Sequence, residues 1–221
     1  MDKLGDIFAR AADSVFGTGQ RAPVFPQIPP QPVTLQQAIE IFDRIAAMKD
    51  LGFDAPHEGC FARAHLSLRR MFGMGLTPKK AWAFEPSGGS LKVRLEDGRK
   101  AVWWAHVAPA LPVRMPDGRV TDLVLDPSLF DGPVSLKEWG RAMEAKDDQL
   151  MFAEAGSAPR GHHGDYNGWG RTDQKTDSRA ASEIAESFAE DPGYKLLRHR
   201  SSLRPVLAGA QLFAKPQTLP R

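Results

Sequence analysis

The hydrophobic pattern changes its period near Thr77, and this change limits the possible folds more than any other feature of the sequence. Before it, apolar residues recur at helical spacing in two segments, residues 35–48 and 60–72. After it, four short segments are typical of strands, with Gly-containing turns between them: residues 82–84, 91–95, 101–107 and 120–125. Short connections join antiparallel neighbours. The sequence therefore predicts an α+β fold with helices packed on an antiparallel sheet.

Capping patterns mark two of the helix starts. Thr34 and Gln37 form a Thr-x-x-Gln capping box ahead of the first helix of the compact body. Ser135 and Glu138 repeat the pattern and predict a later helix that runs through Met143.

The chain divides into four parts. Residues 1–16 have one apolar face and predict an amphipathic N-terminal helix. Residues 17–33 contain five prolines, which favour an extended linker. We assign residues 34–214 to one compact domain, large enough for an enzyme, and expect a further helix at 180–189 within it. Residues 215–221 are assigned to a C-terminal tail.

Charge and cysteine content exclude several classes of protein. The formal net charge is +2, and basic residues alternate with acidic ones, so no nucleic-acid surface is predicted. A single cysteine forms no intramolecular disulfide. Neither a transmembrane run nor a Sec signal is recognisable, so we expect a soluble protein, cytoplasmic or exported without a Sec signal.

That single cysteine, Cys60, follows Gly59 where a loop becomes a helix. A thiol in the first turn lies at the positive end of the helix dipole, which favours the nucleophilic thiolate. The alternative is a small buried hydrophobic residue, the commoner role of an unpaired cysteine.

A histidine and an aspartate are predicted to meet on neighbouring strands. His106 lies in an almost wholly apolar segment typical of a central strand, and Asp126 ends the next one. If the chain turns near residues 115–118, antiparallel pairing joins residues whose numbers sum to about 232–234. His106 and Asp126 fit this sum and are expected in contact, either as part of a reactive site or as a buried structural pair. A slip of one residue would separate them to opposite faces.

Three segments, each holding one of these residues, resemble the bacterial protein-glutaminases. They are Gly59-Cys-Phe-Ala-Arg-Ala-His65, Trp103-Trp-Ala-His-Val-Ala108, and Leu125-Asp-Pro-Ser-Leu-Phe130 followed by Gly132-Pro-Val and Trp139. Those enzymes deamidate protein-bound glutamine and have a core similar to that of transglutaminases and papain-type cysteine hydrolases. The resemblance implies a core with Cys60 at a helix N-terminus and with His106 and Asp126 on adjacent strands.

The resemblance also implies the chemistry. Cys60 would attack the glutamine carboxamide and form a thioester, and His106 would act as acid and then as base. Asp126 would orient the imidazole, and the Cys60 backbone N–H would stabilise the oxyanion. No metal or cofactor is expected. Phe61 and Ala105 depart from the family, which commonly has tyrosine at both positions.

Other residues were weighed for the same site. His57 and His65 flank the cysteine, but we expect His57 in solvent and His65 to brace its helix, pointing away from the thiol. His162 and His163 suggest a metal with Asp165, although adjacent histidines in a Gly-rich loop are more typical of a surface. We expect Ser128 to be a turn residue. The candidate substrate-binding residues are Trp103, Tyr166 and Trp169.

The predicted function is protein-glutamine deamidation on a protein substrate with an exposed glutamine. The alternatives are transglutaminase-type or protease-type acyl transfer on the same residues, or a binding or adaptor module without turnover. The N-terminal helix is expected to serve a secretion or adaptor partner, as in a bacterial effector.

Overall fold

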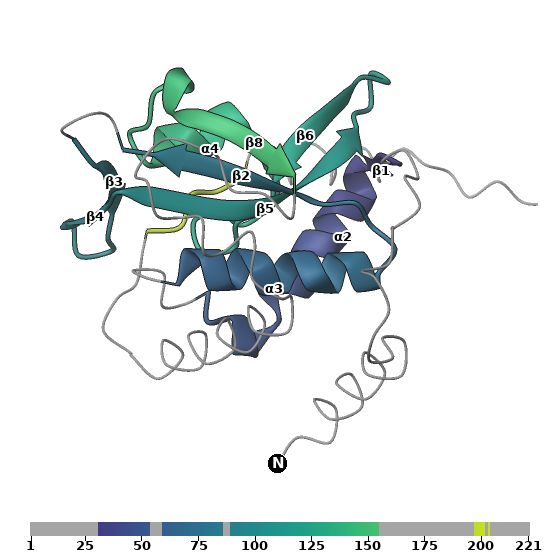
Figure 1. The fold of residues 1–221 in the computed structure, drawn as a ribbon, viewed down its shortest axis with the longest axis horizontal. Coiled ribbons are helices and arrows are strands. Elements are labelled where there is room, and N and C mark those ends of the chain that lie inside the picture. The colour runs from purple at the N-terminus through teal and green to yellow at the C-terminus, as the bar shows by residue number, and fades with distance from the viewer. Residues whose placement is uncertain (1–30, 54–58, 86–88, 155–196, 202, 204–221) are drawn as a thin grey trace, which may run out of the picture.

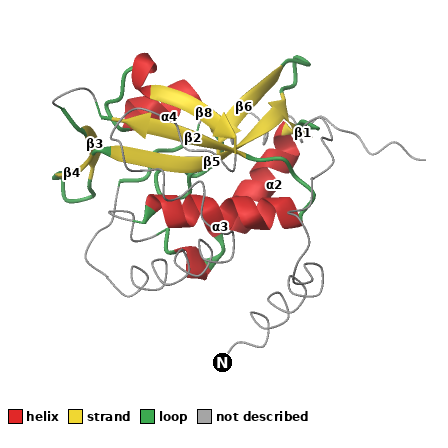
Figure 2. Cartoon of the chain, viewed as in Figure 1, coloured by secondary structure: helices red, strands yellow, loops and turns green. Residues whose placement is uncertain are grey.

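A computed structural model describes residues 31–53, 59–85, 89–154, 197–201 and 203. Its elements are, in chain order, β1 (Val33–Thr34), α2 (Leu35–Ala46), a 3-10 turn (Lys49–Leu51), α3 (Cys60–Gly73), β2 (Lys79–Phe84), β3 (Leu91–Arg94), β4 (Lys100–Trp103), β5 (Ala105–Arg114), β6 (Val120–Val124), β7 (Val134–Ser135), α4 (Leu136–Ala142), a 3-10 turn (Asp147–Gln149) and β8 (Leu150–Glu154). Figure 2 shows these helices and strands by type. The predicted helices at 1–16 and 180–189, most of the linker 17–33 and the tail 215–221 lie outside the described residues.

Within the described residues, the main sheet has six strands and is centred on β5. Its order is β7-β6-β5-β2-β8, every neighbouring pair is antiparallel, and β1 joins β5 in parallel. All residues of β5 except Arg114 are buried. The α+β class with an antiparallel sheet is thus confirmed, and the short parallel pair formed by β1 is an addition to it.

Local sequence explains the helix boundaries. Thr34 caps α2 as predicted, because its hydroxyl accepts from Gln37 N–H and the Gln37 side chain accepts from Thr34 N–H. Ser135 caps α4, where its hydroxyl accepts from Glu138 N–H. The helix α3 begins at Cys60, directly after Gly59, whose φ of 72° glycine adopts without strain.

Helices cover both faces of the sheet (Figure 1). Residues of α2 and α3 form one core with alternate residues of β5 and β6: Leu35, Ile39, Phe42, Ile45, Met71, Leu111, Val113 and Leu123. On the other face, Trp139 and Met143 of the α4 region pack with Ala81, Ala83, Ala108, Ala110 and Val124. Because successive strand residues point to opposite faces, the sheet separates the cluster under α2 from the cluster under α4.

One predicted strand proved to be two. The segment 101–107 was expected to be continuous, but the chain breaks at Trp104, so that residues up to Trp103 pair with β3 in a separate two-stranded sheet. Trp104 lies between the two sheets, and its carbonyl accepts from Glu85 N–H next to the last β2–β5 pair. The small β3–β4 hairpin therefore stands at one end of the main sheet, next to the start of β5 (Figure 1).

Candidate active site

The first half of β5 has one edge that no described strand occupies. Its pairing with β6 begins at Ala110, opposite Val124, whereas residues 105–109 pair only with β2 on the other edge. The helix α3 packs against β5. Cys60 at the start of α3 and Asp126 beyond the end of β6 both reach His106 from outside the strand ladder.

The predicted contact between His106 and Asp126 is present. His106 Nε2 lies 2.8 Å from Asp126 Oδ2, and the two residues are 2% and 3% exposed. Their expected placement on adjacent strands was wrong in detail, because Asp126 lies two residues beyond the last residue of β6. The observed register pairs residues that sum to 234, as in Ala110 with Val124. Continued to Asp126, it would place that residue opposite Ala108, so His106 is reached diagonally along the same face.

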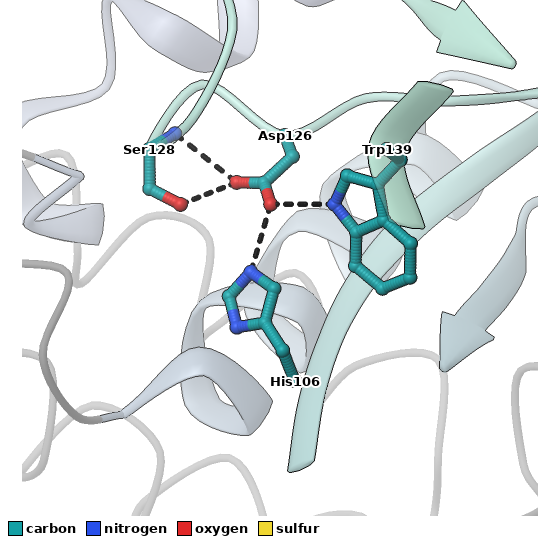
Figure 3. Close-up of polar contacts among 4 residues, drawn as sticks. All are labelled: His106, Asp126, Ser128 and Trp139. Atoms are coloured by element: carbon teal, nitrogen blue, oxygen red, sulfur yellow. Dashed lines mark hydrogen bonds and ion pairs between the residues drawn. The ribbon is translucent and has the colours of Figure 1, made fainter. Parts of the chain in front are cut away.

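Three further donors bind the Asp126 carboxylate (Figure 3). Ser128 donates to Oδ1 from its backbone N–H at 3.1 Å and from its hydroxyl, and Trp139 Nε1 donates to Oδ2 at 2.8 Å. Burial by itself would raise the pKa of Asp126. The positive charge and hydrogen bond of His106, with the hydrogen bonds of Ser128 and Trp139, outweigh burial and lower the pKa to about 2. The carboxylate is therefore ionised at any working pH.

The imidazole of His106 stacks with two indoles. The centroid of the Trp103 ring is 4.6 Å away with the planes 21° apart, and that of Trp139 is 5.5 Å away at 29°. Burial opposes the charged ring, but the charge and hydrogen bond of Asp126, with a smaller contribution from Cys60, raise the pKa of His106 to about 9. The imidazolium is thus the favoured form at neutral pH.

Cys60 and His106 interact electrostatically, although the second ring nitrogen of His106 makes no hydrogen bond of standard geometry within the described residues. His106 Nδ1 is buried and has no partner at standard hydrogen-bond geometry within the described residues. Cys60 is half-buried, and its sulfur interacts with His106 closely enough that each group shifts the pKa of the other. Burial raises the pKa of the Cys60 thiol. The polar contact with His106, the positive charges of His106 and Arg63, and the Val107 N–H lower it below its usual value, and their sum prevails.

Arg63 is a site residue that sequence reasoning missed. Arginine in an amphipathic helix ordinarily lies on the polar face, but Arg63 is 3% exposed and lies one turn after Cys60 on α3. Burial lowers the pKa of its guanidinium, and the negative charges of Cys60 and Asp126 raise it in part. Its spacing of three residues from Cys60, which puts both side chains on one helix face, was the signal available in the sequence.

Ser128 and Trp139 acquire definite contacts. Ser128 is confirmed as a turn residue, since its two donors close the turn on Asp126. Trp139 entered the sequence argument only as part of a motif. Its hydrogen bond to Asp126 depends on how α4 packs on the sheet, which the sequence does not state.

The other candidates lie elsewhere or outside the described residues. His65 is half-buried, and burial together with the positive charges of Lys80 and Arg69 lowers its pKa to about 4. It is therefore neutral, and its titration is set by those neighbours and not by Cys60. His57, His162, His163, Asp165, Tyr166 and Trp169 are outside the described residues, and Trp103 is placed on His106.

Two kinds of feature are absent from the described part of the chain. No three His, Cys, Asp or Glu side chains there gather as they would around a metal ion. No helix there is long and apolar enough to cross a membrane.

The arrangement combines the parts of a thiol nucleophile. A thiol with a lowered pKa at a helix start meets an imidazole that is held at its other nitrogen by a buried carboxylate. Cysteine attacks carbonyl carbon as the thiolate, and an adjacent imidazolium can protonate a leaving group. The roles of Cys60, His106 and Asp126 in a reaction stay predictions.

Comparisons with known proteins point the same way. A family model described as a glutaminase matches residues 38–143. Among solved structures, a crystal structure of protein-glutaminase has a TM-score of 0.52 at 19% identity, with 77% of this chain and 92% of that chain covered. The NMR structure of protein-glutaminase from Chryseobacterium proteolyticum has a TM-score of 0.50 at 21% identity, with 62% and 82% covered.

A longer form is matched as well. A crystal structure of pro-protein-glutaminase has a TM-score of 0.51 at 19% identity over 71% of this chain, which spans 58% of that longer chain. No curated protein matches the sequence. The structural matches show a shared fold, and the family model covers the residues that build the site. Over residues 38–143 this chain is therefore similar to the protein-glutaminases.

Proposed function

We propose that this protein is a cysteine hydrolase that deamidates protein-bound glutamine to glutamate. The observation that carries the proposal is the pairing of a thiol of lowered pKa, Cys60, with a buried imidazole whose far nitrogen is bound by Asp126. The match to the glutaminase family model and the fold shared with protein-glutaminase support the choice of the side-chain amide as the bond attacked.

In the proposed first half-reaction, the Cys60 thiolate adds to the carbonyl carbon of the glutamine carboxamide. The tetrahedral oxyanion forms near the start of α3, where the first backbone N–H groups of a helix have no intrahelical acceptor. The Cys60 N–H is the proposed donor to it. The C–N bond then breaks, and His106 Nδ1 gives its proton to the departing ammonia, leaving a thioester.

In the second half-reaction, neutral His106 takes a proton from water, whose oxygen attacks the thioester. The C–S bond breaks, and glutamate and the Cys60 thiolate with protonated His106 are regenerated. The overall balance is one amide and one water in, one carboxylate and one ammonium out. Asp126 holds Nε2–H throughout, so that the proton exchanged is always the one on Nδ1.

We further propose that the core is of the papain and transglutaminase type. In this arrangement a helix carries the nucleophile at its N-terminus and the sheet carries the histidine. The positions of Cys60 at the start of α3 and His106 on β5 support it.

Ammonia release from a glutamine-rich protein tests the function. Purified protein is incubated with casein, and peptide mass spectra locate the glutamines converted to glutamate. We expect ammonia without crosslinks or new peptide termini. Cys60→Ser and His106→Asn should release none, because a serine hydroxyl remains protonated and an asparagine cannot donate as an acid. His65→Asn is the matched control, because it lies on the same helix and should retain activity.

Other products would decide for the alternatives. Crosslinks between proteins would indicate that an amine replaces water in the second step, as in a transglutaminase. New termini would indicate peptide hydrolysis. A wild-type protein that yields no product of any of these kinds would contradict the enzymatic proposal and favour a binding module.

A further inference from the structure

Every acceptor position of the Asp126 carboxylate is filled. Oδ2 accepts from His106 Nε2 and from Trp139 Nε1, each at 2.8 Å, and Oδ1 accepts from the backbone N–H and the hydroxyl of Ser128. An ionised carboxylate has about four such positions. Because the group is 3% exposed, water does not compete for them, and rotation about the Cβ–Cγ bond would break several bonds at once.

Trp139 contacts both members of the pair. Its Nε1 binds Asp126, and its ring lies 5.5 Å from the ring of His106 at 29° (Figure 3). The side chain itself is completely buried, in the core that α4 forms with the sheet. Because the Trp139 side chain is packed on all sides, it cannot move with a displaced carboxylate. Its hydrogen bond therefore keeps Asp126 in one position.

Ser128 holds the opposite oxygen. It is 2% exposed and follows Asp126 by two residues, so its N–H and hydroxyl close a local turn on Oδ1. The two oxygens are therefore held from two elements, one by α4 and one by the turn after β6. A carboxylate with only His106 as partner could pivot about that bond.

We propose that Trp139 and Ser128 are positioning residues that fix the plane of the Asp126 carboxylate and, through it, direct His106 Nδ1 to the Cys60 sulfur. This inference rests on the proposed function and deepens it, because it names the residues that hold the acid and base in place. The contacts of both residues are with Asp126 and, for Trp139, also with the ring of His106. They act through Asp126.

A consequence for titration follows from the same contacts. Hydrogen bonds to the charged form of an acid lower its pKa, so a variant that lacks one donor has an Asp126 that protonates at higher pH. The groups that face Asp126 and Cys60 are His106 from β5 and Arg63 from α3, and both remain in such a variant. A carboxylate that lacks one donor can also pivot, so it holds the imidazolium of His106 less firmly beside the Cys60 sulfur. The thiolate of Cys60 should then form only at higher pH.

The experiment uses the fact that Cys60 is the only cysteine in the chain. The rate of labelling by iodoacetamide, measured against pH, reports the Cys60 thiolate alone. We compare the wild type with Trp139→Phe, which keeps a ring but lacks the donor, and with Ser128→Ala, which lacks the hydroxyl. In both variants we expect the half-maximal labelling to move to higher pH, and kcat for ammonia release to fall about ten-fold with KM little changed.

Two controls separate positioning from general destabilisation. Ser128→Thr restores a hydroxyl and should return the labelling curve towards that of the wild type. Phe42→Leu disturbs the core under α2, away from Asp126, and should leave the curve in place. If Trp139→Phe does not fold, Ser128→Ala with its threonine rescue tests the Oδ1 side by itself.

The outcomes distinguish this inference from the proposed function. If the wild type deamidates casein but both variants label with the wild-type pH dependence, the positioning role is wrong and the function stands. If the variants shift the labelling curve but no glutamine is converted in the wild type, the deamidase proposal is wrong and the positioning of the thiolate pair stands.

Discussion

Trp103 lies almost flat against His106, with the ring centroids 4.6 Å apart and the planes 21° from parallel. Trp103 is the last residue of β4, so the small β3–β4 hairpin, not the main sheet, covers this face of the imidazole. A cation on the face of an indole gains about 0.5–2 kcal/mol. The hairpin therefore contributes to the charged state of His106 as well as to its orientation.

Replacing Trp103 should affect the chemical step more than binding. We expect Trp103→Ala to lower kcat for ammonia release about ten-fold, because the imidazolium loses a stabilising ring and gains access to water. Trp103→Phe should keep most of the activity. Steady-state ammonia release gives both constants. A raised KM with kcat unchanged would show instead that Trp103 binds substrate, the role that the sequence suggested for it.

Arg63 should tune the reactivity of Cys60. Its buried guanidinium is one of the charges that lower the pKa of the thiol, after the effects of burial and of His106. Arg63→Gln removes that charge, so the thiolate should appear at higher pH. We expect labelling of Cys60 below neutral pH to slow about ten-fold, measured as the rate of reaction with iodoacetamide.

Two companion variants make that test specific to charge. Arg63→Lys keeps a cation and should label faster than Arg63→Gln. Arg69→Gln removes an exposed arginine two turns along the same helix and should label as the wild type does. Equal rates for Arg63→Gln and Arg63→Lys would show that the guanidinium acts through packing alone.

The His106–Asp126 pair should make stability depend on pH at both ends of the range. The folded pKa of Asp126, about 2, lies below its ordinary 3.8, so its contribution is complete above pH 3.8 and is lost as pH falls through 2. The folded pKa of His106, about 9, lies above its ordinary 6.5, so its contribution is complete below pH 6.5 and is lost as pH rises through 9. The pair therefore stabilises most between these ordinary values.

Urea unfolding measures this dependence. Between about pH 5 and about pH 10 the wild type should lose about 3 kcal/mol of unfolding free energy that His106→Gln, which has no titrating ring, does not lose. The comparison between the two proteins removes the contribution of lysines and tyrosines that titrate over the same range. The same loss in both would mean that the ring is not charged in the folded protein.

The contact between His106 and Asp126 could be predicted from the sequence because two simple rules limit where these residues can lie. A polar residue in an apolar strand must find a partner, and a five-residue turn limits the register to a few values. The position from which Asp126 reaches His106 could not be predicted, because strand pairing stops at Val124 and Asp126 lies in the turn that follows. Hairpin arithmetic gives the neighbourhood of a side chain but not the residue at which pairing ends.

Features set by distant packing were missed. The strand β8 pairs with β2, about seventy residues earlier, and only the folded sheet reveals this partner. Arg63 was missed because arginine is rarely buried without charged neighbours, and one of its two neighbours, Asp126, comes from another element. The break at Trp104 was not recognised because the residues on both sides of it are apolar, as in a continuous buried strand. Yet one of them, Val102, is 60% exposed.

Gly140 of α4 lies so close to β8 that any side chain there would collide with Leu150. A Cβ atom built on Gly140 would be 2.4 Å from Leu150 Cδ1, closer than unbonded carbons approach, and 3.0 Å from Cδ2. Gly140→Ala gains about 1 kcal/mol of helix propensity but forces Leu150 from its place, an overpacking that costs about 1–3 kcal/mol. We therefore expect a net loss of stability in urea unfolding.

The second half of a double-mutant cycle identifies the cause. Leu150→Ala removes the colliding methyl groups, so in that background Gly140→Ala should become neutral or stabilising, a strong departure from additivity. Because Gly140 directly follows Trp139, the single Gly140→Ala variant should also move the Cys60 labelling curve to higher pH, and Leu150→Ala should restore it. Additive effects on stability, with labelling unchanged throughout, would show that α4 can shift on β8 without disturbing the indole that binds Asp126.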